Sequence, residues 1–114
     1  MTVHTVQVPT AAGVTPTYAA AGASDSFLPK GSGKHLIHVK NAGASPDNVV
    51  INDPNSVTPE AATQYNPDVT VAVTNAQERM ILIDPARFVN PATGAVEFTN
   101  SFLTSVTIGV FLVG

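Results

Sequence analysis

The sequence predicts an all-β fold: a single-domain antiparallel β-sandwich or a jelly-roll-like barrel of about seven or eight short strands. Nine Pro and eight Gly residues interrupt the chain at short intervals. The runs between them are rich in Val, Ile, Thr and Phe, and turn signals recur roughly every ten residues. No window has a sustained helical period of apolar residues with capping residues at its ends. These features favour short strands joined by turns.

Seven strands are predicted along the chain. They are Thr2–Val8, His35–Lys40, Asn48–Ile51, Val69–Val73, Arg79–Ile83, Ala95–Thr99 and Ser105–Val113. The Ala-rich stretch Tyr18–Gly22 and the segment Pro59–Tyr65 are each predicted to form at most one helical turn. Gly22–Ser26 has the composition of a turn, and Asp84–Arg87 is predicted to be a turn because proline presets φ.

Alternation within the last predicted strand indicates which side chains are buried. Val106, Ile108, Val110 and Leu112 point to one face, whereas Ser105, Thr107 and Gly109 point to the other. Phe111 and Val113 make this second face apolar as well at the end of the strand. The strand end is therefore either central in the fold or covered by a partner chain.

The same reasoning assigns positions and partners to other strands. Arg79–Ile83 is apolar on both faces after its first residue, which predicts a central strand. Residues Asn75–Glu78 suit the turn of a hairpin that joins it to Val69–Val73. Ala95–Thr99 and Ser105–Val113 are expected to form a second pair.

A chain of 114 residues has the length of one domain. Residues 1–30 contain one obvious strand and three prolines, and are expected to form an extended N-terminal segment. This segment is either an arm that lies across a neighbouring molecule or an ordinary first strand with loops. Residues 31–114 are expected to form the β-sandwich core.

Charged residues make up only 11% of the chain, against about a quarter in average proteins. A surface with so little charge protects poorly against association, and normal coverage by other protein would explain it. The net charge is −3 and the five basic residues are scattered, so we expect no nucleic-acid partner. No apolar run is long enough to span a membrane, and the N-terminus lacks the features of a signal peptide.

Gly31-Ser32-Gly33-Lys34 suggests a phosphate-binding loop, which requires the pattern G-x-x-x-x-G-K-[ST]. Leu28 stands where the first glycine belongs, and His35 stands where a hydroxyl must hold magnesium. A β-branched strand follows instead of a helix whose N-terminus would bind the anion. We therefore interpret this stretch as a glycine turn that enters the strand His35–Lys40.

The titratable residues indicate no metal, cofactor or catalytic site. On a strand, His35 and His38 face opposite sides and cannot share a metal without a bulge, and Asp25 is the nearest carboxylate. The default prediction for the three histidines, His4, His35 and His38, is a position on the strand surface. The chain has no cysteine and no recognisable nucleophile motif. We expect a protein that is not an enzyme and needs no cofactor.

Several short segments resemble a set of small proteins from the structural gene clusters of tailed bacteriophages. They are Pro16-Thr17-Tyr18-Ala19-Ala20-Ala21, Asp25-x-Phe27 with the glycine turn, Leu36-Ile37-His38-Val39-Lys40-Asn41, Glu78-Arg79-Met80-Ile81 followed by Pro85 and Phe88, Gly94-x-Val96, and Thr104-Ser105-Val106-Thr107-Ile108-x-Val110. The segments are spread over most of the chain, and each carries little information. The segment Asn52–Tyr65 is longer than in the relatives.

The resemblance implies a head decoration, or capsid cement, protein of the virion, made in the host cytoplasm. Its partners would be the major capsid protein and other copies of itself, with a homotrimer as one candidate, and it implies no catalytic residue. The candidate contact residues are Val3, Val6, Val8, Gly31, Ser32, Gly33, Phe111 and Val113. The alternatives are a tail, neck or fibre-associated β domain, a module that binds carbohydrate or a host surface, and lastly an enzyme.

Overall fold

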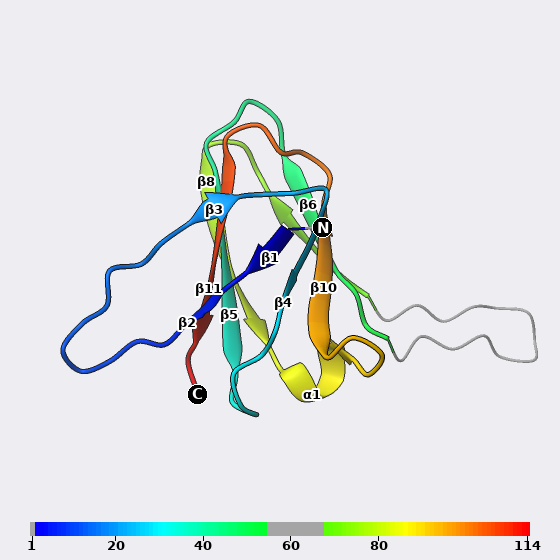
Figure 1. The fold of residues 1–114 in the computed structure, drawn as a ribbon. Helices are drawn as coiled ribbons and strands as arrows, with labels where there is room; N and C mark the ends of the chain where they lie inside the picture. The colour runs from blue at the N-terminus through cyan, green and yellow to red at the C-terminus, as the bar shows by residue number, and fades with distance from the viewer. Residues whose placement is uncertain (1, 55–67) are drawn as a thin grey trace, which may run out of the picture.

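The computed structural model describes residues 2–54 and 68–114 (Figure 1). It contains short strands and one helical turn. The elements are β1 (Thr2–His4), β2 (Val6–Gln7), β3 (Ala19–Ala20), β4 (Ser24–Phe27), β5 (His35–Asn41), β6 (Asp47–Ile51), β7 (Val69–Val73), β8 (Gln77–Ile83), α1 (Pro85–Phe88), β9 (Val89–Asn90), β10 (Ala95–Asn100) and β11 (Val106–Leu112).

The strands form two sheets. The six-stranded sheet has the order β1-β4-β10-β6-β7, with β9 also paired to β10. The five-stranded sheet has the order β2-β11-β5-β8, with β3 also paired to β11. The pairs β1–β4 and β2–β11 are parallel, so both sheets are mixed. The prediction of an all-β sandwich-like fold is confirmed.

The two sheets bury a single apolar core between them. From the six-stranded sheet it receives Phe27, Val49, Ile51, Val73, Val96 and Phe98, and from the five-stranded sheet Ile37, Val39, Ile81, Ile83, Val106, Ile108 and Val110. Alternate residues of β5 are buried along its whole length, as a strand with one face in the core requires. Full burial of each such side chain contributes about 1.5–3 kcal/mol.

The predicted pairing of sequence neighbours is wrong in two places. β7 pairs with β6 in one sheet, whereas β8 pairs with β5 in the other, so the turn between β7 and β8 crosses between sheets. β10 and β11 likewise lie in different sheets. A sandwich can bury the apolar faces of consecutive strands by placing them opposite one another as well as side by side. Turn composition alone does not distinguish these arrangements.

The predicted central position of β8 is also wrong. Among the described residues, β8 pairs only with β5 and forms an edge of its sheet. Ile81 and Ile83 enter the core, but Met80 and Leu82 are 69% and 61% exposed. β8 is therefore apolar on both faces because one face enters the core and the other forms an exposed apolar surface.

Three local predictions need correction. The Ala-rich stretch contains strand β3 in place of a helical turn, and the turn-like Gly22–Ser26 leads into strand β4. Asp84–Arg87 lies at a short helix, α1, because the Asp84 side chain accepts a hydrogen bond from the Ala86 amide and Pro85 occupies the first turn. The segment Pro59–Tyr65 lies outside the described residues.

Residues 1–30 contribute to both sheets. The predicted single strand Thr2–Val8 is instead two short strands, because the chain passes from β1 in the six-stranded sheet to β2 in the five-stranded sheet at Thr5. β4 then continues the first sheet beside β1. Between β2 and β3, residues 8–17 form a loop that projects away from the two sheets (Figure 1). We call residues 8–17 the arm.

Candidate interaction surface

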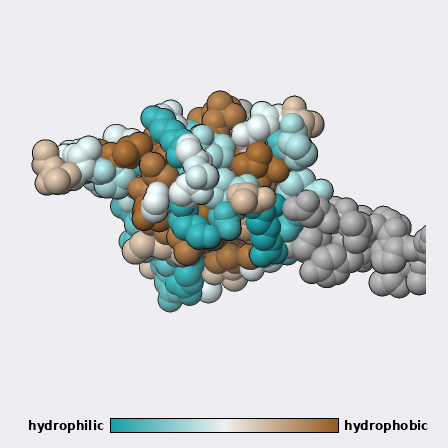
Figure 2. Space-filling view, turned by 90° about the horizontal axis from the view of Figure 1, so that it is seen from below, coloured by the Kyte–Doolittle hydropathy of each residue, from teal (hydrophilic) through white to brown (hydrophobic). Residues whose placement is uncertain are grey.

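Exposed apolar side chains gather at the end of the sandwich where the C-terminus lies. Val8 follows β2, Leu28 follows β4 and Val113 follows β11, and these three are 42%, 58% and 50% exposed. The Gly31–Gly33 turn lies at the same end, because Lys34 O accepts a hydrogen bond from Val113 N (2.9 Å). We call Val8, Leu28, Val113 and this turn the basal surface. Figure 2 views this end and shows hydrophobic residues interrupted by hydrophilic ones.

The glycine turn is held in place by a buried histidine. His35 Nδ1 lies 2.8 Å from Gly33 O, and His35 Nε2 accepts a hydrogen bond from Lys30 N at 3.0 Å. These contacts place the proton of a neutral His35 on Nδ1. The ring stacks on Phe27 with centroids 5.6 Å apart. The prediction that His35 lies on the strand surface is wrong, because its side chain closes the turn from inside the core.

Two glycines give the turn its shape. Gly31 adopts φ +76°, where other residues are strained. A Cβ at Gly33 would overlap the carbonyl oxygen of Gly114, so glycine lets the C-terminus pack against the turn. This role matches the interpretation of Gly31-Ser32-Gly33-Lys34 as a turn that enters a strand.

Two ion pairs lie beside the basal surface, and the exposed Lys30 lies within it. Lys34 Nζ lies 2.9 Å from Asp84 Oδ2, and this hydrogen bond lowers the pKa of Asp84, with a smaller contribution from the Ala86 amide. Arg87 Nε lies 2.8 Å from Asp53 Oδ2. These pairs offset four of the charges in this region, and the Lys30 ammonium adds one positive charge beside Leu28. A surface of this kind suits contact with protein.

The candidate contact residues fall into three groups. Val8, Gly31, Ser32, Gly33 and Val113 come together at the basal surface. Val3 is 64% exposed on the edge strand β1, and Phe111 is half-buried on the outer face of the five-stranded sheet. Val6 is only 3% exposed and belongs to the core, so its side chain is not on the surface.

Sequence reasoning missed a second apolar surface. Phe111, Leu36 and Leu82 lie side by side on β11, β5 and β8, and Met80 lies two residues before Leu82 on the same face. We call these four residues the apolar strip. The outer face of the other sheet instead exposes Ser24, Asn48, Thr70, Ala72 and Thr99. The sequence signal was the apolar run of β8, which was assigned to the core.

The arm is anchored at its base although its own side chains are exposed. Gln7 Nε2 donates to Thr17 O and Thr17 N donates to Gln7 Oε1, both at 2.8 Å. Tyr18, the next residue, places its hydroxyl 2.7 Å from His38 Nδ1, and His38 Nε2 lies 2.7 Å from Glu78 Oε1. The base of the arm is therefore tied to β2, β5 and β8.

Gly109 lets Tyr18 lie close to β11. A Cβ at Gly109 would be 2.9 Å from the Tyr18 ring. The ring also packs edge-on against Phe111, with centroids 6.0 Å apart, and Lys40 Nζ lies 3.9 Å from its centroid. These contacts hold both the hydroxyl and the ring of Tyr18.

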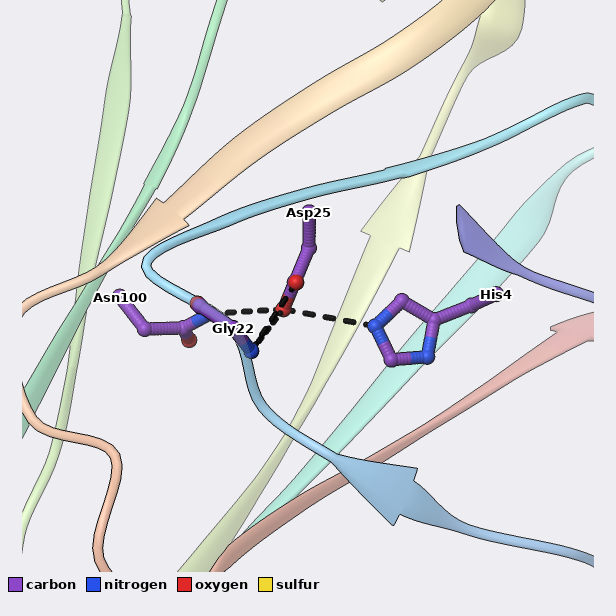
Figure 3. Close-up of polar contacts among 4 residues, drawn as sticks. All are labelled: His4, Gly22, Asp25 and Asn100. Atoms are coloured by element: carbon purple, nitrogen blue, oxygen red, sulfur yellow. Dashed lines mark hydrogen bonds and ion pairs between the residues drawn. The ribbon is translucent and has the colours of Figure 1, made fainter. Parts of the chain in front are cut away.

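A buried polar cluster joins four segments of the chain (Figure 3). Asp25 is fully buried, and its carboxylate accepts hydrogen bonds from Gly22 N at 3.0 and 3.1 Å and from Asn100 Nδ2 at 2.9 Å. His4 Nε2 lies 3.3 Å from Asp25 Oδ2. These partners occupy the carboxylate, so the cluster fastens β1 to β4 and β10. His4 is only 5% exposed, so the prediction that it lies on the strand surface is wrong.

The described part of the chain supplies no group of three or more His, Cys, Asp or Glu side chains arranged to hold a metal ion. His35 and His38 lie on opposite faces of β5, as expected. In the same part of the chain, no helix has the length and apolar character needed to cross a membrane. Comparison with known proteins found no matching family model, no similar curated protein and no similar solved structure.

Proposed function

We propose that the protein is a structural component of a bacteriophage particle that decorates and stabilises the outer capsid surface through protein–protein contacts. The observation that carries this proposal is the basal surface. It combines three exposed apolar side chains, a rigid glycine turn and paired charges at one end of the sandwich. The phage context rests on the sequence resemblance described above.

The basal surface suits a repeated, weak contact. Its apolar side chains can be buried by a partner, exposed backbone groups of the turn can form hydrogen bonds with it, and Lys30 is the one charged side chain within the surface. A capsid presents the same site many times, so small interfaces are sufficient when decorating molecules also contact one another. The His35 contacts hold the turn before binding, which reduces the entropy lost on association.

Cosedimentation with expanded empty capsids of its own phage tests the proposal. The wild-type protein is expected to bind and to raise the resistance of the capsids to heat or chaotrope. Leu28→Asp and Val113→Asp are expected to abolish binding while leaving the fold intact, because both side chains are exposed. Thr99→Asp, on the polar outer face of the six-stranded sheet, is the matched control. Failure of the wild type to bind any capsid form would refute the capsid function.

A tail, neck or fibre location is the second candidate, and mass spectrometry of separated heads and tails distinguishes it. Carbohydrate binding is less well supported, because sugar sites on β-sandwiches use exposed aromatic platforms. The Tyr18 hydroxyl lies against His38, and Lys40 lies over its ring. Tyr65 lies outside the described residues. A glycan array without hits would exclude the common sugars.

A further inference from the structure

The arm leaves the five-stranded sheet at one edge, and the apolar strip runs from Phe111, beside the base of the arm, to Met80 and Leu82 at the other edge. The arm leaves the five-stranded sheet at β2, which is one end of the strand order β2-β11-β5-β8, and the strip reaches the other end at β8. Met80 and Leu82 on β8 are the most exposed members of the strip. A contact between the arm of one molecule and the strip of another would therefore join molecules head to tail.

The arm has the chemistry of a segment that is buried on binding. Its ten residues, Val8–Thr17, include no charged side chain, and every one of them is exposed. Val14 at 46% and Val8 at 42% are its large apolar side chains. The tip is a turn in which Gly13 N donates to Thr10 O at 2.9 Å, and Gly13 has φ +90°. Such a loop gains free energy by placing its apolar side chains on an apolar surface.

The anchor at the base of the arm argues for a preformed binding element. Gln7 and Thr17 close the loop with two hydrogen bonds, and Tyr18 is held by His38, Phe111 and Lys40. These contacts fix where the arm leaves the body while its own side chains remain free. Restricting a loop before binding lowers the entropy lost on association.

The apolar strip offers a matching acceptor. Leu36, Leu82 and Phe111 form one row across three adjacent strands, with Met80 alongside. Exposed apolar groups that are contiguous mark sites of association, whereas isolated ones do not. Methionine adapts its shape to a partner surface. The uncharged arm approaches this strip without having to desolvate a charge of its own.

We propose that the apolar strip is the docking site for the arm of a second copy of this chain, with Val14 of one molecule against Met80 and Leu82 of the next. The contact is heterologous, so it closes into a ring or continues as a chain, depending on the rotation between neighbours. It uses Val14 and the outer face of the five-stranded sheet, shares with the basal surface only Val8 at the start of the arm, and does not depend on capsid binding.

Disulfide trapping tests the proposal directly, because the natural chain contains no cysteine. Val14→Cys and Met80→Cys proteins, one carrying an isotope label, are mixed with glutathione disulfide as the oxidant. Heterodimers between the two variants are expected to form severalfold faster than between Val14→Cys and a Thr99→Cys control, in which the thiol lies on the exposed polar face. Equal rates with Met80→Cys and Thr99→Cys, or dominant Val14→Cys homodimers, would overturn the arm-to-strip contact.

Sedimentation velocity over a range of concentrations gives a second, independent readout. The wild type is expected to associate as its concentration rises, and Val14→Asp and Met80→Asp are each expected to shift it to monomer. Urea unfolding of these variants checks that their stability is retained. A wild type that stays monomeric at its solubility limit would refute the proposal. Both experiments are performed without capsids, so they leave the test of the decoration function separate.

Discussion

Asp25 links the N-terminal strand to the rest of the six-stranded sheet. Its buried carboxylate has partners from β1, from the segment before β4 and from the end of β10. Removing one member of a buried polar network leaves the others without partners in a low-dielectric interior. Asp25 therefore adds side-chain contacts to the backbone pairing of β1 with β4 at the N-terminal edge.

We predict that Asp25→Ala lowers the free energy of unfolding by roughly 1–3 kcal/mol, because it leaves the buried Gly22 amide and Asn100 Nδ2 without their carboxylate acceptor. Urea denaturation followed by circular dichroism measures the change. Thr99→Ala, an exposed substitution on the adjacent strand β10, serves as the control and is expected to change stability by no more than about 0.5 kcal/mol. A similarly small effect for Asp25→Ala would show that the cluster contributes little.

Asp47 makes the free energy of unfolding depend on pH. Burial raises the pKa of Asp47, although hydrogen bonds from the Phe102 and Ser101 amides to its Oδ1 act to lower it. Because the folded-state pKa lies above the unfolded value, this carboxyl favours folding most when protonated. Its contribution falls as pH rises from the unfolded pKa through the folded one.

We expect Asp47→Asn to remove this dependence, because the Asn oxygen can still accept from both amides and does not ionise. Urea unfolding from about pH 3 to about pH 7 should show the stability of the wild type falling relative to the variant as pH increases. A constant difference between the two proteins over this interval would contradict the raised pKa.

At the scale of elements, the arm is held mainly by its base. Gln7→Ala is predicted to free residues 8–17 by removing both hydrogen bonds to Thr17. Global stability should change by less than about 1 kcal/mol, because exposed hydrogen bonds contribute little net free energy. Nuclear magnetic resonance relaxation measures the result: lower order parameters are expected in the arm and unchanged ones in β5 and β11. Unchanged order in the arm would show that Tyr18 alone fixes it.

The strands with clear period-two patterns could be predicted from sequence, and their partners could not. β5, β6, β7, β10 and β11 fall within one residue of their expected ends. β4 was missed because Ser24-Asp25-Ser26 has the composition of a turn, and its burial depends on partners at His4 and Asn100. Local propensity contains no information about such distant contacts.

The candidate contact residues were also predictable only in part, because their exposure depends on contacts that are distant in sequence. Exposed valines and a glycine turn suggested contact residues, and five of the eight gather at the basal surface. Val6 did not, because the register of β2 beside Val110 turns its side chain into the core. The apolar strip was not predicted, because an apolar run such as that of β8 is equally compatible with a central strand and with an exposed edge strand.

At the scale of the whole molecule, residues 2–7 and the arm have different roles. Deleting residues 2–7 removes strands from both sheets and is predicted to lower the free energy of unfolding by at least about 2 kcal/mol, since burial of Val6 alone contributes about 1.5–3 kcal/mol. Replacing residues 10–15 with a Gly-Ser linker of equal length should leave stability nearly unchanged. Thermal unfolding of both variants provides the comparison, and equal losses would contradict this division.

The passage of the chain between sheets at Thr5 also has a consequence for synthesis. β2 is made long before β11, yet the two strands pair in parallel, with Val6 beside Val110. While a ribosome is still adding the last residues, the five-stranded sheet lacks the strand that lies between β2 and β5. Ile37 and Val39 then have no complete core to enter, so folding of this sheet must wait until β11 has left the ribosome. A stalled nascent chain that ends before β11 should therefore be sensitive to protease throughout, whereas the released protein should be resistant.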